Sequence, residues 1–147
     1  MTGVTILGST GSIGVSTLDV LARHPERFRV VALTAHRDVE TMLAQCREFR
    51  PTLVAMADPQ AARHLRERLA DAPGAPAVLA GVDGVREAAV LPEAQVVMAA
   101  IVGAAGLVPT LAAAMAGKRL LLANKEALVV AGALLMQAVA DHGAELL

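Results

Sequence analysis

The sequence predicts an α/β fold, a parallel and doubly wound sheet in a single domain with helices on both faces. Its 147 residues are about the length of one domain and suffice to bury a core. Short apolar segments alternate with segments of helical period, which is the pattern of βαβ units. The apolar segments are continuous, as in strands covered on both faces, and this accounts for a hydrophobic content of 55% with only 18% charged residues.

The elements are expected in strict alternation along the chain. Continuous apolar runs predict strands at 4–7, 29–33, 52–56, 77–79, 95–101 and 119–123. Apolar residues at helical spacing predict helices at 12–23, 38–49, 59–70, 85–89, 107–116 and 125–141. Ser12, Asp38 and Asn124 stand where three of these helices begin, and each is a residue type that caps helices. Gly and Pro residues at 73–76 fall between elements, and 144–147 predict the opening of a seventh strand.

An uncharged stretch at 94–117 is long enough to cross a bilayer, but it does not predict a membrane span. Gly103, Gly106 and Pro109 interrupt it, and many of its other residues are alanine. A strand, a glycine-rich turn and a buried helix explain this stretch better. Because the first strand begins so near the N-terminus that no signal peptide fits before it, we expect a cytoplasmic protein without a membrane anchor.

Charge and cysteine content argue against two further classes of function. The 13 Lys and Arg residues balance 14 Asp and Glu residues to a net charge of -1, and no Trp or Tyr is present to stack on bases, so nucleic-acid binding is not expected. Cys46 is the single cysteine, which allows neither an internal disulfide nor a thiolate metal cluster. We expect it to be a buried thiol rather than a nucleophile. No histidines are spaced as metal ligands.

A glycine-rich turn, Gly8-Ser9-Thr10-Gly11-Ser12-Ile13-Gly14, stands between the first strand and the first helix. Such a turn lets backbone N–H groups at a helix N-terminus face a diphosphate, because glycines lack the Cβ atoms that would block a close approach. Hydroxyl groups of Thr10 and Ser12 are further candidate donors to phosphate oxygens. The alternative is a purely structural turn with Ser12 as cap. The βαβ context favours dinucleotide binding.

The end of the second strand is expected to meet the adenosine ribose, where NAD enzymes usually carry an acidic residue. This chain has His36-Arg37-Asp38 after the strand. Arg37 can pair with a 2′-phosphate and His36 can lie against adenine, which favours NADP. Asp38 is either a contact to the ribose or, more simply, the N-cap of the next helix.

Asn124-Lys125-Glu126 follows the sixth strand, at the edge of the predicted ligand crevice. Lys125 is suited to hold an anionic or hydroxylated substrate, and the neighbouring amide and carboxylate can contact ribose or nicotinamide. A cap, a solvated lysine and a first-turn acid explain the same residues equally well. Residues 127–136 are apolar on every helical face, which indicates that another domain or subunit covers them.

Read together, these segments resemble the N-terminal NADPH-binding domain of the 1-deoxy-D-xylulose 5-phosphate reductoisomerases, over the whole chain. The resemblance is carried by motifs at 6–14, 16–20, 28–33, 97–107 and 121–126, of which the last two are the most specific. It implies a Rossmann-like fold for residues 1–147. It also implies that the family's catalytic and C-terminal domains, with the ligands of its metal, are absent from this chain.

The resemblance assigns roles to residues of this sequence. It implies that the cofactor phosphates are held in the glycine turn, and that the adenosine 2′-phosphate is surrounded by His36, Arg37 and Asp38. It implies that Lys125 reaches a sugar-phosphate substrate. The cofactor-binding residues that it implies are Gly8, Thr10, Gly11, Ser12, Ile13, His36, Arg37, Asp38, Ala100, Ile101, Asn124 and Glu126. Many family members have Gly-Lys-Asn at 36–38, so Asp38 places an unusual negative charge near a phosphate.

The family reaction that the resemblance implies belongs to the non-mevalonate isoprenoid pathway. A ketose phosphate is rearranged to an aldehyde, which NADPH reduces to 2-C-methyl-D-erythritol 4-phosphate, with a divalent metal, Mg or Mn, on the substrate oxygens. Family members are usually homodimers. The isolated chain is expected to bind NADPH without turning over substrate.

The sequence also allows two other functions. A different NADP-dependent reductase, such as a semialdehyde dehydrogenase, would use a cysteine nucleophile near a strand end, where Cys46 does not lie. A stand-alone NADP(H)-binding module without catalysis would shift the equilibrium of a partner on binding. The module explains the apolar last helix equally well.

Overall fold

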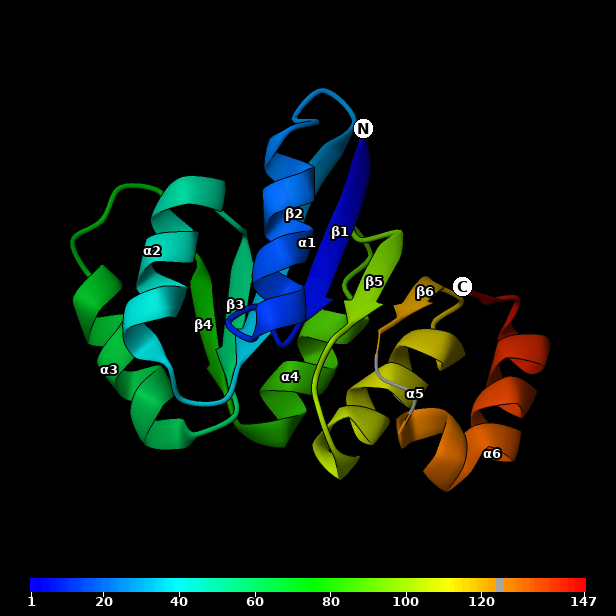
Figure 1. The fold of residues 1–147 in the computed structure, drawn as a ribbon. Coiled ribbons are helices and arrows are strands. Elements are labelled where there is room, and N and C mark those ends of the chain that lie inside the picture. Colours follow the sequence, from blue (N-terminus) through cyan, green and yellow to red (C-terminus); the bar gives the residue numbers. More distant parts are fainter. Residues whose placement is uncertain (124–125) are drawn as a thin grey trace.

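A parallel sheet in the order β4-β3-β2-β1-β5-β6-β7 forms the centre of the computed structural model, which describes residues 1–123 and 126–147 (Figure 1). Its strands are β1 (Thr2–Leu7), β2 (Phe28–Ala35), β3 (Leu53–Met56), β4 (Ala77–Ala80), β5 (Val96–Ala99), β6 (Arg119–Leu122) and β7 (Glu145–Leu146). The helices are α1 (Ser12–Ala22), α2 (Val39–Phe49), α3 (Pro59–Leu69), α4 (Gly81–Ala89), α5 (Leu107–Met115) and α6 (Glu126–His142), with a 3-10 turn, η1 (Ala104–Gly106). The predicted fold class is confirmed.

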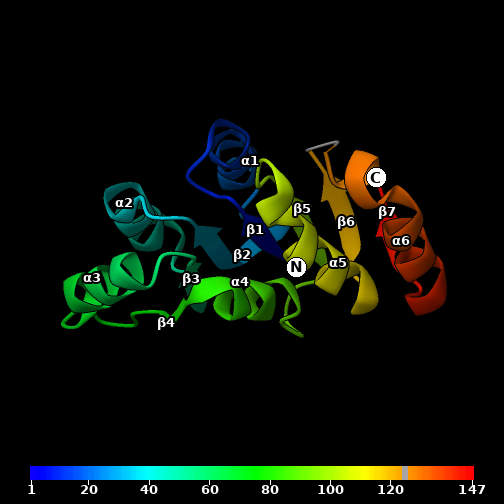
Figure 2. The same cartoon turned by 90° about the horizontal axis from the view of Figure 1, so that it is seen from below.

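Two apolar cores lie on the two faces of the sheet. Alternate residues of β1 divide between them, so that Ile6 packs with α1, α2 and α3, whereas Leu7 packs with α4, α5 and α6. Figure 2 shows α1 and α2 on one side of the strands and α4 on the other. Cys46 is buried in the first core, and burial raises the pKa of its thiol to about 11, as expected for an inert thiol. Both faces are covered, which explains the continuous apolar strands.

The strand predicted at 95–101 ends earlier than expected, at Ala99. The amide of Ala100 still donates to the carbonyl of Leu7 at 2.9 Å, but the chain then leaves the sheet toward the pocket described below. Gly103 has φ 78°, a conformation that glycine adopts without strain. The apolar run therefore continues past the end of its strand into a loop that lines the pocket.

The helix predicted at 85–89 begins earlier, at Gly81. Two glycines so close together, Gly81 and Gly84, suggest a turn. In the structure Gly84 lies inside the helix, where it packs closely against Leu79. A Cβ atom built on Gly84 would lie 2.8 Å from the Cβ of Leu79. Glycine here permits α4 to pack closely on the end of β4, which sequence patterning does not distinguish from a turn.

The stretch at 94–117 forms β5, η1 and α5, as predicted. Among the described residues, no helix is both long enough and apolar enough to cross a membrane. The last helix, α6, contains a non-helical residue, Ala131, with φ −143° and ψ 37°. It exposes apolar side chains, with Val129 83% and Leu134 56% accessible. Coverage of this face by another domain or subunit remains a prediction.

Lys118 is a buried lysine at the amino edge of the sheet, just before β6. Its side chain is buried, and its Nζ donates to the carbonyl oxygens of Leu91 at 2.6 Å and Ala94 at 2.5 Å. Burial lowers the pKa of this ammonium group, and the carboxylate of Glu93 opposes that shift. Lys118 thus holds the loop between α4 and β5 and lies at the opposite edge from the carboxyl ends of the strands.

Candidate functional site

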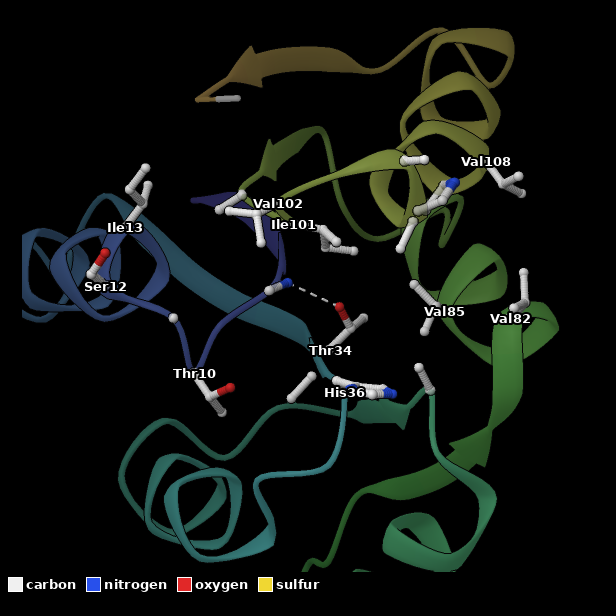
Figure 3. A pocket seen from close by; sticks show the side chains of 18 residues that line it. Thr10, Ser12, Ile13, Thr34, His36, Val82, Val85, Ile101, Val102 and Val108 are labelled. Carbon is white, nitrogen blue, oxygen red and sulfur yellow. Dashed lines mark hydrogen bonds between the residues drawn. The ribbon is translucent and has the colours of Figure 1, made fainter. Parts of the chain in front are cut away.

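A cavity of about 390 Å³ opens at the carboxyl ends of β1, β2 and β5. The strand order reverses here, because the chain adds β2, β3 and β4 on one side of β1 and then crosses to β5 on the other. Ligands of open α/β sheets bind at such switch points. In Figure 3 the turn with Thr10, Ser12 and Ile13 lies on one side of the cavity, and Val82, Val85 and Val108 lie on the opposite side.

Gly8 places the turn against two neighbouring strands. Its φ of 83° suits glycine, and a Cβ atom there would lie 2.9 Å from the carbonyl oxygen of Ala100. The Gly8 amide donates to the backbone oxygen and to Oγ1 of Thr34, each at 3.1 Å, and the latter bond is drawn in Figure 3. The amide of Ser9 donates to the same Thr34 carbonyl at 2.8 Å. These bonds tie the turn to the end of β2.

The next amides of the turn have no such partner. Within the described part of the chain, the backbone N–H groups of residues 10–13 donate no hydrogen bond, whereas Val15 already donates to Gly11 at 2.9 Å. Thr10, Gly11, Ser12 and Ile13 all line the cavity. Unpaired amides at a helix N-terminus carry partial positive charge and are the groups that bind a phosphate.

Gly14 allows the first turn of α1 to pack directly on the backbone of Gly8 and Ser9. A Cβ atom at Gly14 would lie 2.2 Å from the carbonyl oxygen of Gly8 and 2.6 Å from the Cα of Ser9. Ser12 does not cap the helix, since Gly11 is the N-cap residue of α1 and no side chain makes a cap hydrogen bond. The structural alternative for Ser12 is therefore wrong, and its hydroxyl is left facing the cavity.

His36, Arg37 and Asp38, after β2, were predicted to surround the adenosine 2′-phosphate, and one of the three lines the cavity. His36 lines the cavity, and Arg37 and Asp38 follow it as exposed residues beyond the lining. Oδ1 of Asp38 accepts a hydrogen bond from the amide of Thr41 at 3.1 Å, so Asp38 is the N-cap of α2, the simpler of its two roles. Contact of Arg37 or Asp38 with a cofactor stays a prediction.

Several lining residues were not predicted from the sequence. Most of them are apolar: Thr34, Ala35, Ala57, Val82, Val85, Val102, Ala104, Ala105, Val108 and Pro109. Val82 and Val102 are 62% and 77% exposed, so this wall of the cavity presents apolar surface to whatever occupies it. Their place in the sequence could have identified Ala57 and Val82 as lining residues. They follow the ends of β3 and β4, and the carboxyl ends of parallel strands meet at one edge of the sheet.

The predicted residues at 100–101 line the cavity, as expected for a loop that follows β5. The amide of Ala123 donates to the carbonyl of Ala99 at 3.1 Å, so the end of β6 lies at this same edge. Asn124 and Lys125 lie outside the described residues. Glu126 is the first residue of α6, and its side chain is outside the description as well.

A metal centre is not formed by the residues that the structure describes. Among them, no group of three or more His, Cys, Asp or Glu side chains could hold an ion. The cavity combines glycine backbone, hydroxyl groups and apolar side chains instead. This arrangement suits a long, partly apolar ligand with a phosphate group.

Comparison with known proteins shows similarity to one enzyme family. A family model described as 1-deoxy-D-xylulose 5-phosphate reductoisomerase matches residues 4–132. A relative of that name from Methylococcus capsulatus is 62% identical over 148 residues, which is 100% of this chain and 38% of the relative.

Solved structures show the same similarity. A reductoisomerase from Zymomonas mobilis in complex with NADPH has a TM-score of 0.93 and 46% identity over 99% of this chain and 38% of its own. A DOX-P reductoisomerase in complex with NADPH, fosmidomycin and magnesium has a TM-score of 0.96 and 46% identity over 100% of this chain and 36% of its own. The chain thus spans little more than a third of the length of the proteins it matches.

Proposed function

Because the chain belongs to the 1-deoxy-D-xylulose 5-phosphate reductoisomerase family, we propose that residues 1–147 are an NADPH-binding domain and that the cavity holds the cofactor. The whole protein is then an NADPH-dependent enzyme of the non-mevalonate pathway. It converts 1-deoxy-D-xylulose 5-phosphate to 2-C-methyl-D-erythritol 4-phosphate. This chain supplies the cofactor-binding part.

The proposal rests mainly on the unpaired amides of residues 10–13 at the mouth of the cavity. Four unpaired N–H groups of consecutive residues lining one cavity suit an acceptor with several oxygens, and a diphosphate has them. The missing side chain at Gly8 lets the turn pack against the backbone of Ala100 beside the cavity. The residues present therefore fit a dinucleotide.

The residues at the two sides of the turn would hold the two ends of the cofactor. His36 and Arg37 would hold the adenosine end, where the guanidinium group would pair with a 2′-phosphate. Ala100 and Ile101, with the predicted contacts Asn124 and Glu126, would hold the nicotinamide end. NADPH would supply a hydride when bound, and Lys125 is the predicted contact to the sugar-phosphate substrate.

The metal of the proposed reaction has no ligand set among the described residues. Mg or Mn would be held by a part of the family's length that this chain does not span. The 147-residue chain is accordingly expected to bind NADPH without forming product. A coupled assay of the purified chain with ketose phosphate, NADPH and Mg²⁺ checks this, and measurable product formation would contradict it.

Replacing Arg37 by alanine is expected to weaken NADPH binding by roughly ten- to a hundredfold while NADH binding changes by less than about twofold, since a charge-assisted contact to the 2′-phosphate is lost. Fluorescence titration of both cofactors against the wild-type chain and the variant measures the effect. Equal wild-type affinities for NADPH and NADH would contradict the assignment of this end.

A matched control separates the local contact from a change in net charge. Arg63 is an exposed arginine on α3, away from the cavity. The Arg63→Ala variant loses the same charge, and both cofactors are expected to bind to it as to the wild-type chain. If Arg63→Ala weakens NADPH as much as Arg37→Ala does, general electrostatic attraction explains the preference instead.

A further inference from the structure

Ser9 is held in place by a hydrogen-bonded pair that links the turn to α2. Oγ of Ser9 donates to Oε1 of Gln45 at 2.8 Å, and Nε2 of Gln45 donates to the backbone oxygen of Ser9 at 2.9 Å. Both residues are buried, with 0% of Ser9 and 7% of Gln45 accessible. Since the Ser9 amide already donates to Thr34, all three hydrogen-bonding groups of Ser9 are fixed.

Gln45 is unusual for its position on α2. The other buried residues of this helix are apolar: Val39, Met42, Leu43 and Cys46. A buried amide side chain is costly unless its hydrogen bonds are made, and a polar pair contributes little net stability over an apolar pair of the same shape. Packing alone thus gives no reason for glutamine here, whereas both of its bonds go to one residue of the turn.

The direction of the Ser9 peptide decides where the following amides point. Ser9 directly precedes the unpaired N–H groups of residues 10–13, and on its other side it touches the backbone of α1 at Gly14. A rotation of this peptide would turn those amides away from a shared acceptor. Gln45 prevents that rotation from a helix that itself begins just after His36, Arg37 and Asp38.

We propose that Gln45 is a positioning residue for the cofactor diphosphate. Through Ser9 it fixes the four amides, and through α2 it sets their distance from the segment that meets the adenosine 2′-phosphate. This inference rests on the proposed function, because it assumes that the cavity binds an NADP cofactor. It does not require Gln45 to touch the cofactor.

The test replaces Gln45 by methionine, which keeps the length of the side chain and removes both hydrogen bonds. NADP⁺ is titrated into the 15N-labelled 147-residue chain, and its dissociation constant is measured together with the amide shifts of residues 10–13. In the wild-type chain these amides are expected to move downfield as they bond phosphate. Gln60→Met, an exposed glutamine in the first turn of α3, is the matched control.

Gln45→Met is expected to weaken NADP⁺ binding roughly tenfold and to reduce the downfield shifts even at saturation, while Gln60→Met behaves as wild type. A purely structural role for Gln45 would lower the melting temperature but leave the affinity and the saturated shifts of the folded chain unchanged. That result would overturn the inference. Absence of NADP⁺ binding by the wild-type chain would instead overturn the proposed function.

Ser9→Ala keeps the test decisive if Gln45→Met does not fold. It removes only the hydroxyl, so one bond of the pair remains. A loss of affinity of about threefold, with the amide shifts reduced in the same residues, supports the inference. Wild-type affinity and wild-type shifts would contradict it.

Discussion

Alanine at position 14 is expected to weaken NADPH binding roughly a hundredfold and to lower the free energy of unfolding by roughly 3 kcal/mol. The added methyl group would stand 2.2 Å from the carbonyl oxygen of Gly8 and 2.6 Å from the Cα of Ser9, both backbone atoms that cannot rotate away. Either α1 or the turn has to move, and the amides of residues 10–13 move with it. Urea unfolding followed by circular dichroism gives the stability, and fluorescence titration gives the affinity.

Gly11→Ala is the matched control for this variant. A Cβ atom at Gly11 would meet only the carbonyl oxygen of Gly8 at an ordinary 3.8 Å, and its φ of −77° suits any residue. Stability is therefore expected to stay the same or to rise by up to about 1 kcal/mol. If Gly11→Ala destabilised the chain as much as Gly14→Ala, close packing of α1 on the turn would not be the cause.

Alanine at position 3 is expected to cost a similar free energy of unfolding, roughly 3 kcal/mol, without changing the NADPH affinity of the folded chain. Its Cβ atom would lie 2.1 Å from the carbonyl oxygen of Glu93 and 2.9 Å from Cγ2 of Val31. Both backbone polar groups of Gly3 are hydrogen-bonded to Gln95. The Gly3 amide donates to Oε1 of Gln95 at 2.6 Å, and the Gly3 carbonyl accepts from the amide of Gln95 at 3.0 Å. The strand therefore cannot shift without losing these bonds.

The same two measurements separate Gly3 from Gly14, because Gly3 lies at the amino end of β1 and the cavity opens at the carboxyl ends of the strands. Gly132→Ala on α6 is a control in which the new Cβ atom meets nothing within 4 Å, and no loss of stability is expected. An unfolding midpoint of Gly3→Ala equal to that of the wild-type chain would show that β1 and the loop before β5 are less tightly packed than described.

The sequence could predict the sheet because its signals are local. Residues such as Leu33 and Val54 lie in unbroken apolar runs, and these runs form central strands whose side chains are buried on both faces. The start of α4 and the end of β5 could not be predicted in the same way. Glycine at position 84 and alanine at position 100 are compatible with several local structures, and only packing against distant residues decides between them.

In the site, too, features set by local sequence could be predicted and features set by distant packing could not. The turn from Gly8 to Ile13 could be predicted to line the cavity because its residues are consecutive in the sequence. The apolar wall at Val82 and Val108 was not, since it depends on which strands become neighbours at the edge of the sheet. The pairing of Ser9 with Gln45 joins residues 36 positions apart, and no spacing rule connects them.

The bonds from Gly8 and Ser9 to Thr34 order the turn proposed to hold the cofactor before any cofactor binds. A flexible loop would have to give up conformational entropy on binding, and that loss would be subtracted from the affinity. Here the turn is ordered during folding, so binding of the proposed diphosphate is expected to lose little affinity to ordering of this turn. Association is then expected to proceed without a slow rearrangement of this turn.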